Sequence, residues 1–106
     1  MTTQPTMQNI TINNLTAKNR KVVDKNCVST DFYFGDKFLF NEVSFSTTKG
    51  KTVDYQYFTN LQLTRLAANE LAQKINAQTF SNYDGHSIYF NDFNKALEFI
   101  NSEDFR

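Results

Sequence analysis

The sequence predicts a small α+β domain, with an antiparallel sheet built on a three-stranded meander plus a short hairpin, and two amphipathic helices packed on one face. Three observations predict it. Apolar residues alternate with polar ones between positions 28 and 58, as in half-buried strands. Apolar residues recur at helical spacing in 63–75 and 93–100. Glycine-containing turn sequences separate the strand segments.

The chain has 106 residues, which fits one domain. Residues 1–9 are polar and show no period, so we expect a flexible N-terminal tail and a single domain over 10–106. Ile10 and Ile12 alternate with polar neighbours, which predicts a short strand. Residues 16–26 form the most basic stretch, and they fit either a short helix or an irregular connection.

The meander follows from two turns. Gly35-Asp36 can form a two-residue hairpin loop, because glycine readily adopts positive φ at its first position. This loop would join a strand at 28–34 to one at 37–47. A three-residue loop at 48–50, closed by Gly50, would then lead to a strand at 51–58.

This register places Phe32 opposite Leu39 and Phe45 opposite Val53. A two-residue loop at 49–50 would instead move Val53 and Tyr55 to the face of the serines in the preceding strand. The hydrophobic pattern favours the first register. The predicted core face then carries Phe32, Phe34, Leu39, Val43, Phe45, Val53, Tyr55 and Tyr57.

Two helices and a second hairpin follow. Thr59 and Gln62 have the spacing of a capping box, which predicts a helix start there. Residues 79–80 and 87–90 flank the turn sequence Asp84-Gly85 and predict a hairpin. Asn91 or Asp92 can cap the last helix. The apolar stripes are Leu63, Leu66, Ala67, Leu71 and Ile75 in the first helix, and Phe93, Ala96, Leu97 and Ile100 in the second.

The sequence shows no catalytic or metal-binding motif, and we expect no enzyme activity and no cofactor. Cys27 and His86 are the only residues of their types, so they could make neither a disulfide nor a four-ligand zinc site. An enzyme that used a Cys27–His86 dyad or scattered carboxylates is the least favoured hypothesis. An ordinary surface histidine and a small buried cysteine are the simpler interpretations.

Charge and hydropathy limit the partners. Lys+Arg and Asp+Glu both number 11, so the net charge is zero, whereas duplex-DNA binders usually carry a basic excess. No apolar run approaches the roughly 20 residues of a membrane span, and no signal peptide is recognised at the N-terminus. We therefore expect a cytoplasmic protein that does not enter a membrane.

Two surfaces are candidates for binding. The predicted register puts Tyr33, Phe38 and Phe40 on the sheet face opposite the core. There they would form an exposed aromatic patch or be covered by a helix or by the N-terminal segment. We assign them, with Tyr89, as partner-binding anchors. The basic residues Lys18, Arg20, Lys21 and Lys25 are either a solvated loop or, combined with exposed aromatics, a contact for single-stranded nucleic acid.

These features favour a non-enzymatic protein that inhibits or regulates a larger protein or protein–nucleic-acid complex. The alternative is a sheet domain that binds single-stranded nucleic acid. In size and composition the chain resembles the small proteins encoded by phages and mobile elements, of which anti-CRISPR inhibitors are one group. That resemblance is one of type and assigns a role to no residue. The oligomeric state stays open, because an edge strand could also pair across a dimer.

Overall fold

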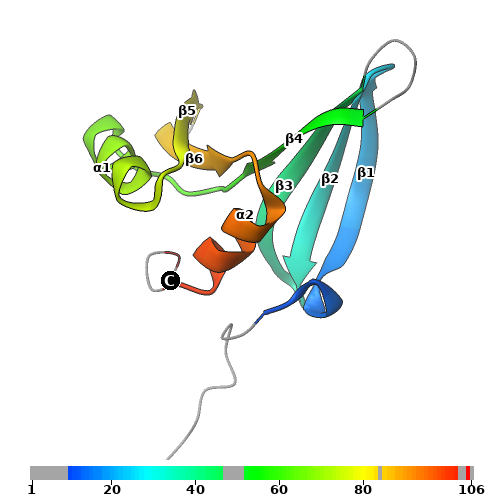
Figure 1. Ribbon diagram of the computed structural model, residues 1–106, viewed down its shortest axis with the longest axis horizontal. Coiled ribbons are helices and arrows are strands. Elements are labelled where there is room, and N and C mark those ends of the chain that lie inside the picture. The colour runs from blue at the N-terminus through cyan, green and yellow to red at the C-terminus, as the bar shows by residue number, and fades with distance from the viewer. Residues whose placement is uncertain (1–9, 47–51, 84, 103–104, 106) are drawn as a thin grey trace, which may run out of the picture.

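The structure, a computed structural model, describes residues 10–46, 52–83, 85–102 and 105, and has an α+β fold with a six-stranded antiparallel sheet (Figure 1). Its order is β1-β2-β3-β4-β6-β5. The predicted tail at 1–9 and loop at 48–50 lie outside the described residues. The elements are β1 (Thr16–Asp24), β2 (Cys27–Phe34), β3 (Lys37–Ser46), β4 (Thr52–Phe58), α1 (Arg65–Ile75), β5 (Gln78–Asn82), β6 (Gly85–Phe90) and α2 (Phe93–Ile100).

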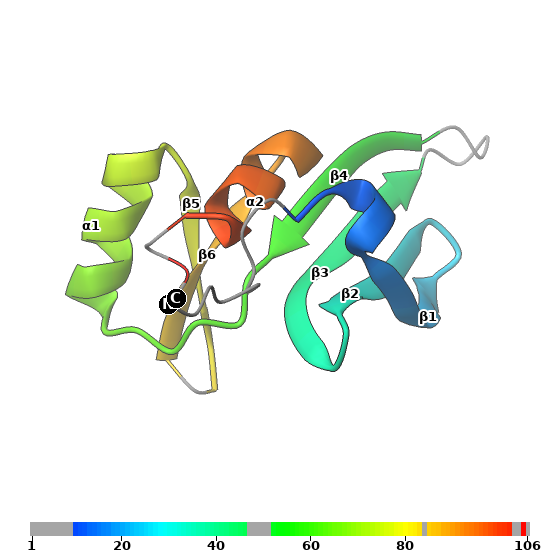
Figure 2. The same cartoon turned by 90° about the horizontal axis from the view of Figure 1, so that it is seen from below.

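Both helices lie on one face of the sheet, over β4, β5 and β6, and leave the far end of the meander uncovered (Figures 1 and 2). The core therefore sits between the helices and the sheet strands nearest to them. Its fully or almost fully buried residues are Ile10, Leu39, Phe40, Tyr57, Ala72, Ile88, Phe90, Ala96, Phe99 and Ile100. We call the opposite side of the sheet the open face.

The N-terminal part differs from the prediction. Residues 16–24 are neither a helix nor an irregular connection: they form the edge strand β1, which extends the meander by one strand. Residues 10–13 are not a strand, because a 3-10 helix spans Ile12–Asn14. Ile10 instead fixes the chain to the end of α2, where its N–H donates to Asn101 Oδ1 at 2.8 Å.

The first predicted hairpin has the expected turn, with Gly35 at φ 62° and Phe34 opposite Lys37. The next pair, Tyr33 with Phe38, also keeps the predicted register, but a β-bulge at Leu39 then pairs Phe32 with Phe40 rather than with Leu39. Because an extra residue in one strand inverts the faces beyond it, Phe40 turns toward the helices. Phe40 is 0 % exposed, so the prediction that it lies on a solvent-facing patch is wrong.

Next to the loop, Ser46 pairs with Thr52, as the favoured register requires, but a β-bulge between Phe45 and Ser46 shifts the rest of β3 to the register that the hydrophobic pattern disfavoured. Phe45 pairs with Asp54, and Ser44 pairs with Tyr55. With the bulge at Leu39, this register moves Val43 and Phe45 to the open face and keeps Tyr55 and Tyr57 on the helix side. Tyr55 lies beyond the helices and is 41 % exposed. The predicted core face was therefore wrong for the second half of β3.

Helix α1 begins later than predicted. Its N-cap is Thr64, whose hydroxyl accepts from the N–H of Ala67 at 3.1 Å. Thr59 is not a cap: its buried hydroxyl bonds to Ser87 Oγ at 2.7 Å and donates to the carbonyl of Ile88 at 2.9 Å. The segment after β4 thus continues alongside β6. Leu66, predicted for the apolar stripe, is 69 % exposed.

The C-terminal elements agree with those predicted from the sequence. Strands β5 and β6 form the predicted second hairpin, with Asn82 opposite Gly85. Asp92 caps α2, because its carboxylate accepts from the N–H of Asn94 at 2.8 Å. Phe93 then packs against three rings of the meander, Phe32, Phe40 and Tyr57. Helix α2 therefore joins the hairpin half of the sheet to the meander half.

Candidate binding face

The open face is crossed by one continuous row of paired residues, one from each of the six strands. Each member lies directly opposite the next in the strand register, so all six side chains project from the same side of the sheet. None of them is buried. From β1 to β5 the row is Lys18, Asp31, Asn41, Phe58, Tyr89 and Gln78.

At the hairpin end of this row three rings form an aromatic cluster. Phe58 stacks on Tyr89 with ring centroids 5.0 Å apart, and its ring meets Phe80 edge-on, also at 5.0 Å. Phe80 and Tyr89 lie 6.1 Å apart. The three residues come from β4, β5 and β6, and all are only half-buried. The cluster therefore presents a rigid apolar surface to solvent.

A second aromatic pair lies toward the meander edge. Tyr33 and Phe38 make an edge-to-face contact with centroids 5.7 Å apart. The ammonium group of Lys18 lies 4.7 Å from the centre of the Tyr33 ring, within the range of a cation–π interaction. The bulge at Leu39 is the reason why Phe38 stays on the open face while Phe40 enters the core.

A hydrogen-bonded polar network lies between the two groups of rings. The amide nitrogen of Asn41 donates to Asp31 Oδ1 at 2.9 Å and to Ser29 Oγ at 2.7 Å. The other carboxylate oxygen of Asp31 accepts from Asn19 Nδ2 at 3.1 Å. Asn19 stands in a bulge of β1 and has a positive φ of 57°. These bonds fix the orientation of the polar groups before any partner arrives.

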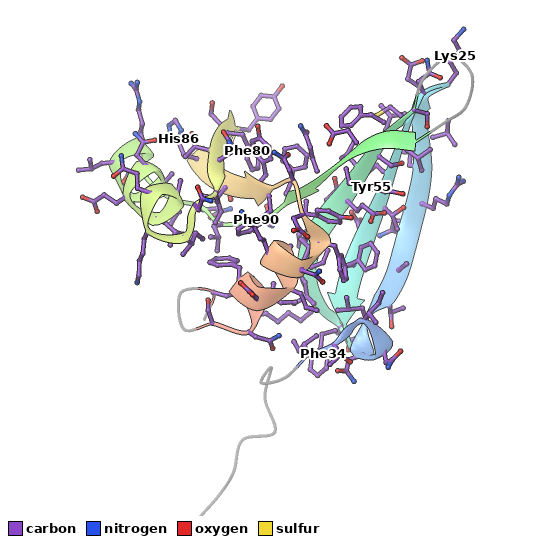
Figure 3. The ribbon with its side chains drawn as sticks, in the orientation of Figure 1. Lys25, Phe34, Tyr55, Phe80, His86 and Phe90 are labelled. Carbon is purple, nitrogen blue, oxygen red and sulfur yellow. The ribbon has the colours of Figure 1, made fainter. Side chains whose placement is uncertain are left out.

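The structure brings most of the predicted binding residues to this face. Tyr33, Phe38 and Tyr89 lie on it, and Phe40 does not. Of the basic residues, Lys18 and Lys21 pair with Asp31 and Ser29 and share the open face with the rings. Arg20 stands in the bulge between them and is exposed. Lys25 lies in the turn after β1 and is also exposed (Figure 3).

Phe58 and Phe80 were not predicted as part of the binding surface. The alternation within a strand shows only that Phe58, or Phe80, lies on the same face as the residues two positions away in its own strand. It does not show that β4 lies beside β6, because a helix and another strand separate them in the sequence. Only that non-local pairing joins Phe58 to Tyr89.

Cys27 and His86 do not form a dyad. Cys27 begins β2 and pairs with Asp24 and Phe45 at the meander end of the sheet. His86 is the second residue of β6, where its backbone N–H and carbonyl bond to Leu63. Their side chains also project from opposite faces, since His86 lies two residues before the buried Ile88 on the helix side.

Three further observations are not specific to the open face. No group of three or more His, Cys, Asp or Glu that could hold a metal ion is present among the described residues. No helix within the described ranges is long and apolar enough to cross a membrane. Comparison with models of protein families, with curated proteins and with solved structures finds no match.

Proposed function

We propose that this chain is a small non-enzymatic binding protein that inhibits or regulates a larger protein or protein–nucleic-acid complex by covering part of its surface with the open face. The observation that carries the proposal is that five aromatic residues lie half-buried on a sheet face that neither α1 nor α2 covers. They are Tyr33, Phe38, Phe58, Phe80 and Tyr89. They form two apolar groups with a polar network between them, and exposed apolar groups bordered by polar residues mark interaction sites.

The chemistry of the face suits a protein surface. Aromatic residues dominate interface energetics, and tyrosine combines a large ring with a polar tip. The charges around the rings are of both signs, with Lys18 and Lys21 on the same face as Asp31 and Asp54. A partner with a mixed polar and apolar surface would therefore meet complementary groups, and no strong field of one sign would repel it.

The first class of partner that we would test is a Cas effector complex. We choose this class because the chain resembles anti-CRISPR inhibitors in size and composition, and these inhibitors act by occupying a surface of such complexes. A binding face on one side of a small sheet suits that mode of action. The same face could equally engage another large assembly, so the experiment begins from capture rather than from a single assay of inhibition.

Alanine variants of the open face test the proposal. The double variant Tyr33→Ala/Tyr89→Ala removes one ring from each aromatic group, whereas Tyr55→Ala removes a half-exposed ring from the helix side. The immobilised wild-type protein is used to capture partners from its host, and mass spectrometry identifies them. We expect Tyr55→Ala to retain the wild-type partner and the double variant to lose it, with similar thermal unfolding curves. A double variant that still captured the partner would refute the proposal.

A second candidate is binding of single-stranded nucleic acid, which one observation favours. Lys18 and Lys21 share the open face with the rings, so phosphates could meet the lysines while bases stack on Tyr33 and Phe58. Fluorescence anisotropy with a labelled oligonucleotide tests it. Binding should weaken steeply between about 50 and 200 mM salt, because phosphate contacts release counterions.

A pair of charge variants provides the control for this candidate. Lys18→Gln/Lys21→Gln should weaken oligonucleotide binding, and Lys74→Gln/Lys95→Gln, which removes the same charge from the helices, should leave it unchanged. Oligonucleotide binding that changed neither with salt concentration nor in the Lys18→Gln/Lys21→Gln variant would count against a nucleic-acid role. It would leave the open face as a protein-binding surface.

A further inference from the structure

A polar groove lies between α1 and the β5–β6 hairpin, on the side of the sheet opposite the open face. Its volume is about 530 Å³. Small-molecule sites in proteins commonly have volumes of roughly 300–1,000 Å³, so the groove has room for more than a single ion. Its lining residues are Arg65, Ala68, Asn69, Thr79, Phe80, Ser81 and His86.

The local structure explains why these residues meet. Arg65, Ala68 and Asn69 are spaced i, i+3 and i+4 and therefore share one face of α1. Thr79 and Ser81 alternate along β5 and project toward the helix, and His86 pairs directly with Ser81. Figure 3 shows His86 beside α1, on the helix side of the hairpin.

The polar side chains of the groove can all donate hydrogen bonds. They comprise a guanidinium, an amide, two hydroxyls and an imidazole, and no carboxylate is among the described residues that line the groove. None of the five makes a side-chain hydrogen bond or ion pair with another described residue. By contrast, the pocket between α1 and α2 contains both Lys95 and Glu98. The described side chains of the groove are therefore unengaged donors, and together they carry a positive charge.

We propose that this groove binds a phosphoryl group, either as free phosphate or as the terminal group of a small phosphate ester. The guanidinium of Arg65 suits a phosphate because its planar donors match two phosphate oxygens at once. The hydroxyls of Thr79 and Ser81, together with His86, supply further donors from the opposite wall. Phe80 borders both the groove and the open face, but Tyr33 and Tyr89 are not among the described residues that line the groove, so the two proposals can be tested separately.

Solution NMR of the whole chain tests the proposal with three probes: inorganic phosphate, glycerol 3-phosphate and glycerol. We expect both phosphates to shift the backbone signals of Arg65, Asn69, Ser81 and His86 saturably, and glycerol to shift none. Tighter binding of glycerol 3-phosphate would identify an ester as the ligand, whereas equal affinities would identify the free anion. Either result supports a phosphoryl site.

Two arginine variants make the test specific. Arg65→Gln should weaken phosphate binding by about tenfold or more, since hydrogen bonds to charged groups are strong. Arg20→Gln makes the same chemical change on β1, away from the groove, and should leave binding unchanged. The spectrum of each variant outside its own site reports whether the fold is intact.

Three results would overturn the phosphoryl site: shifts that do not saturate, shifts centred on β1, or equal weakening by both arginine variants. The open-face variant Tyr33→Ala/Tyr89→Ala separates the two proposals. It should lose the captured partner and bind phosphate normally. Absence of phosphate binding in the groove would therefore not affect the proposed function. Capture of the partner by the open-face variant would refute the proposed function but not the phosphoryl site.

Discussion

Phe40 joins the sheet to the helix α2. Its ring contacts Phe32 of β2 at 5.3 Å, Tyr57 of β4 at 5.7 Å and Phe93 of α2 at 6.0 Å between centroids. No part of it is exposed. Phe38, only two residues away, lies half-buried on the open face. Phenylalanine is thus a core residue at position 40 and a surface residue at position 38.

This difference can be measured. Phe40→Ala should lower the free energy of unfolding by about 3–5 kcal/mol, because it removes a buried ring and leaves a cavity. Phe38→Ala removes an equal side chain from a half-exposed site and should have a clearly smaller effect. Urea unfolding followed by circular dichroism compares the two. Equal losses of stability would mean that Phe38 belongs to the core and is not part of the open face.

Tyr57 links the core to the pH dependence of stability. Burial, and then the nearby carboxylate of Glu42, hold the pKa of its hydroxyl well above the usual value. Glu42 also accepts a hydrogen bond from this hydroxyl. The folded protein therefore keeps the proton more tightly than the unfolded chain does. The resulting stabilisation is complete below the unfolded-state pKa of about 10 and is lost as the pH rises above it.

Phenylalanine variants isolate this contribution. The free energy of unfolding of the wild-type protein should fall as the pH rises from about 10 to 11. Tyr57→Phe cannot ionise at this position, so its stability should fall less steeply. Tyr55→Phe provides the matched control, since Tyr55 stacks on Tyr57 but is 41 % exposed. Denaturant unfolding at each pH gives the slopes, and identical slopes for Tyr57→Phe and the wild type would contradict the assignment.

At the scale of elements, the sequence predicts best the segments whose signals are local. The Gly35 turn, the hairpin of β5 and β6, and the Asp92 cap of α2 each depend on residues adjacent in the chain. The bulge of β3 does not. Three consecutive apolar residues, Phe38 to Phe40, are compatible with either face, and it is the packing of Phe93 from α2 that decides which ring is buried.

Strand β1 and the start of α1 were missed for different physical reasons. All nine residues of β1 are exposed, so neither side of the strand requires apolar residues and no alternation appears in the sequence. Thr59 and Thr64 are both plausible caps by residue type. The choice depends on Ser87, which bonds to Thr59 from a distant strand and leaves the cap to Thr64.

At the scale of the whole molecule, the candidate site is only partly contained in the sequence. Tyr33, Phe38 and Tyr89 could be selected as surface aromatics from alternation within single strands. That these residues share one face could not be predicted, because it requires the pairing of β4 with β6 and the bulge at Leu39. The row across six strands therefore emerges from the topology, and the functional proposal depends on that topology rather than on a motif.

The uneven cover of the sheet predicts uneven local stability. Strand β6 pairs with neighbours on both sides, contacts both helices and contains the fully buried Ile88. β1 pairs only with β2, and Val22 on it is 60 % exposed. Few buried apolar contacts oppose local opening of β1, whereas opening of β6 would disrupt the core.

Native-state hydrogen exchange, read by NMR or mass spectrometry, should therefore show fast exchange throughout β1 and strong protection in β6 and α2. A matched reference lies within the meander itself: β3 is paired on both sides, so its first half beneath α2 should be better protected than β1. A bound partner on the open face should raise protection in β1 and β2 more than in β6, because β6 is already near the limit set by global unfolding. Amides of β1 that were as protected as those of β6 would show that the meander edge is stabilised by contacts other than those of the sheet.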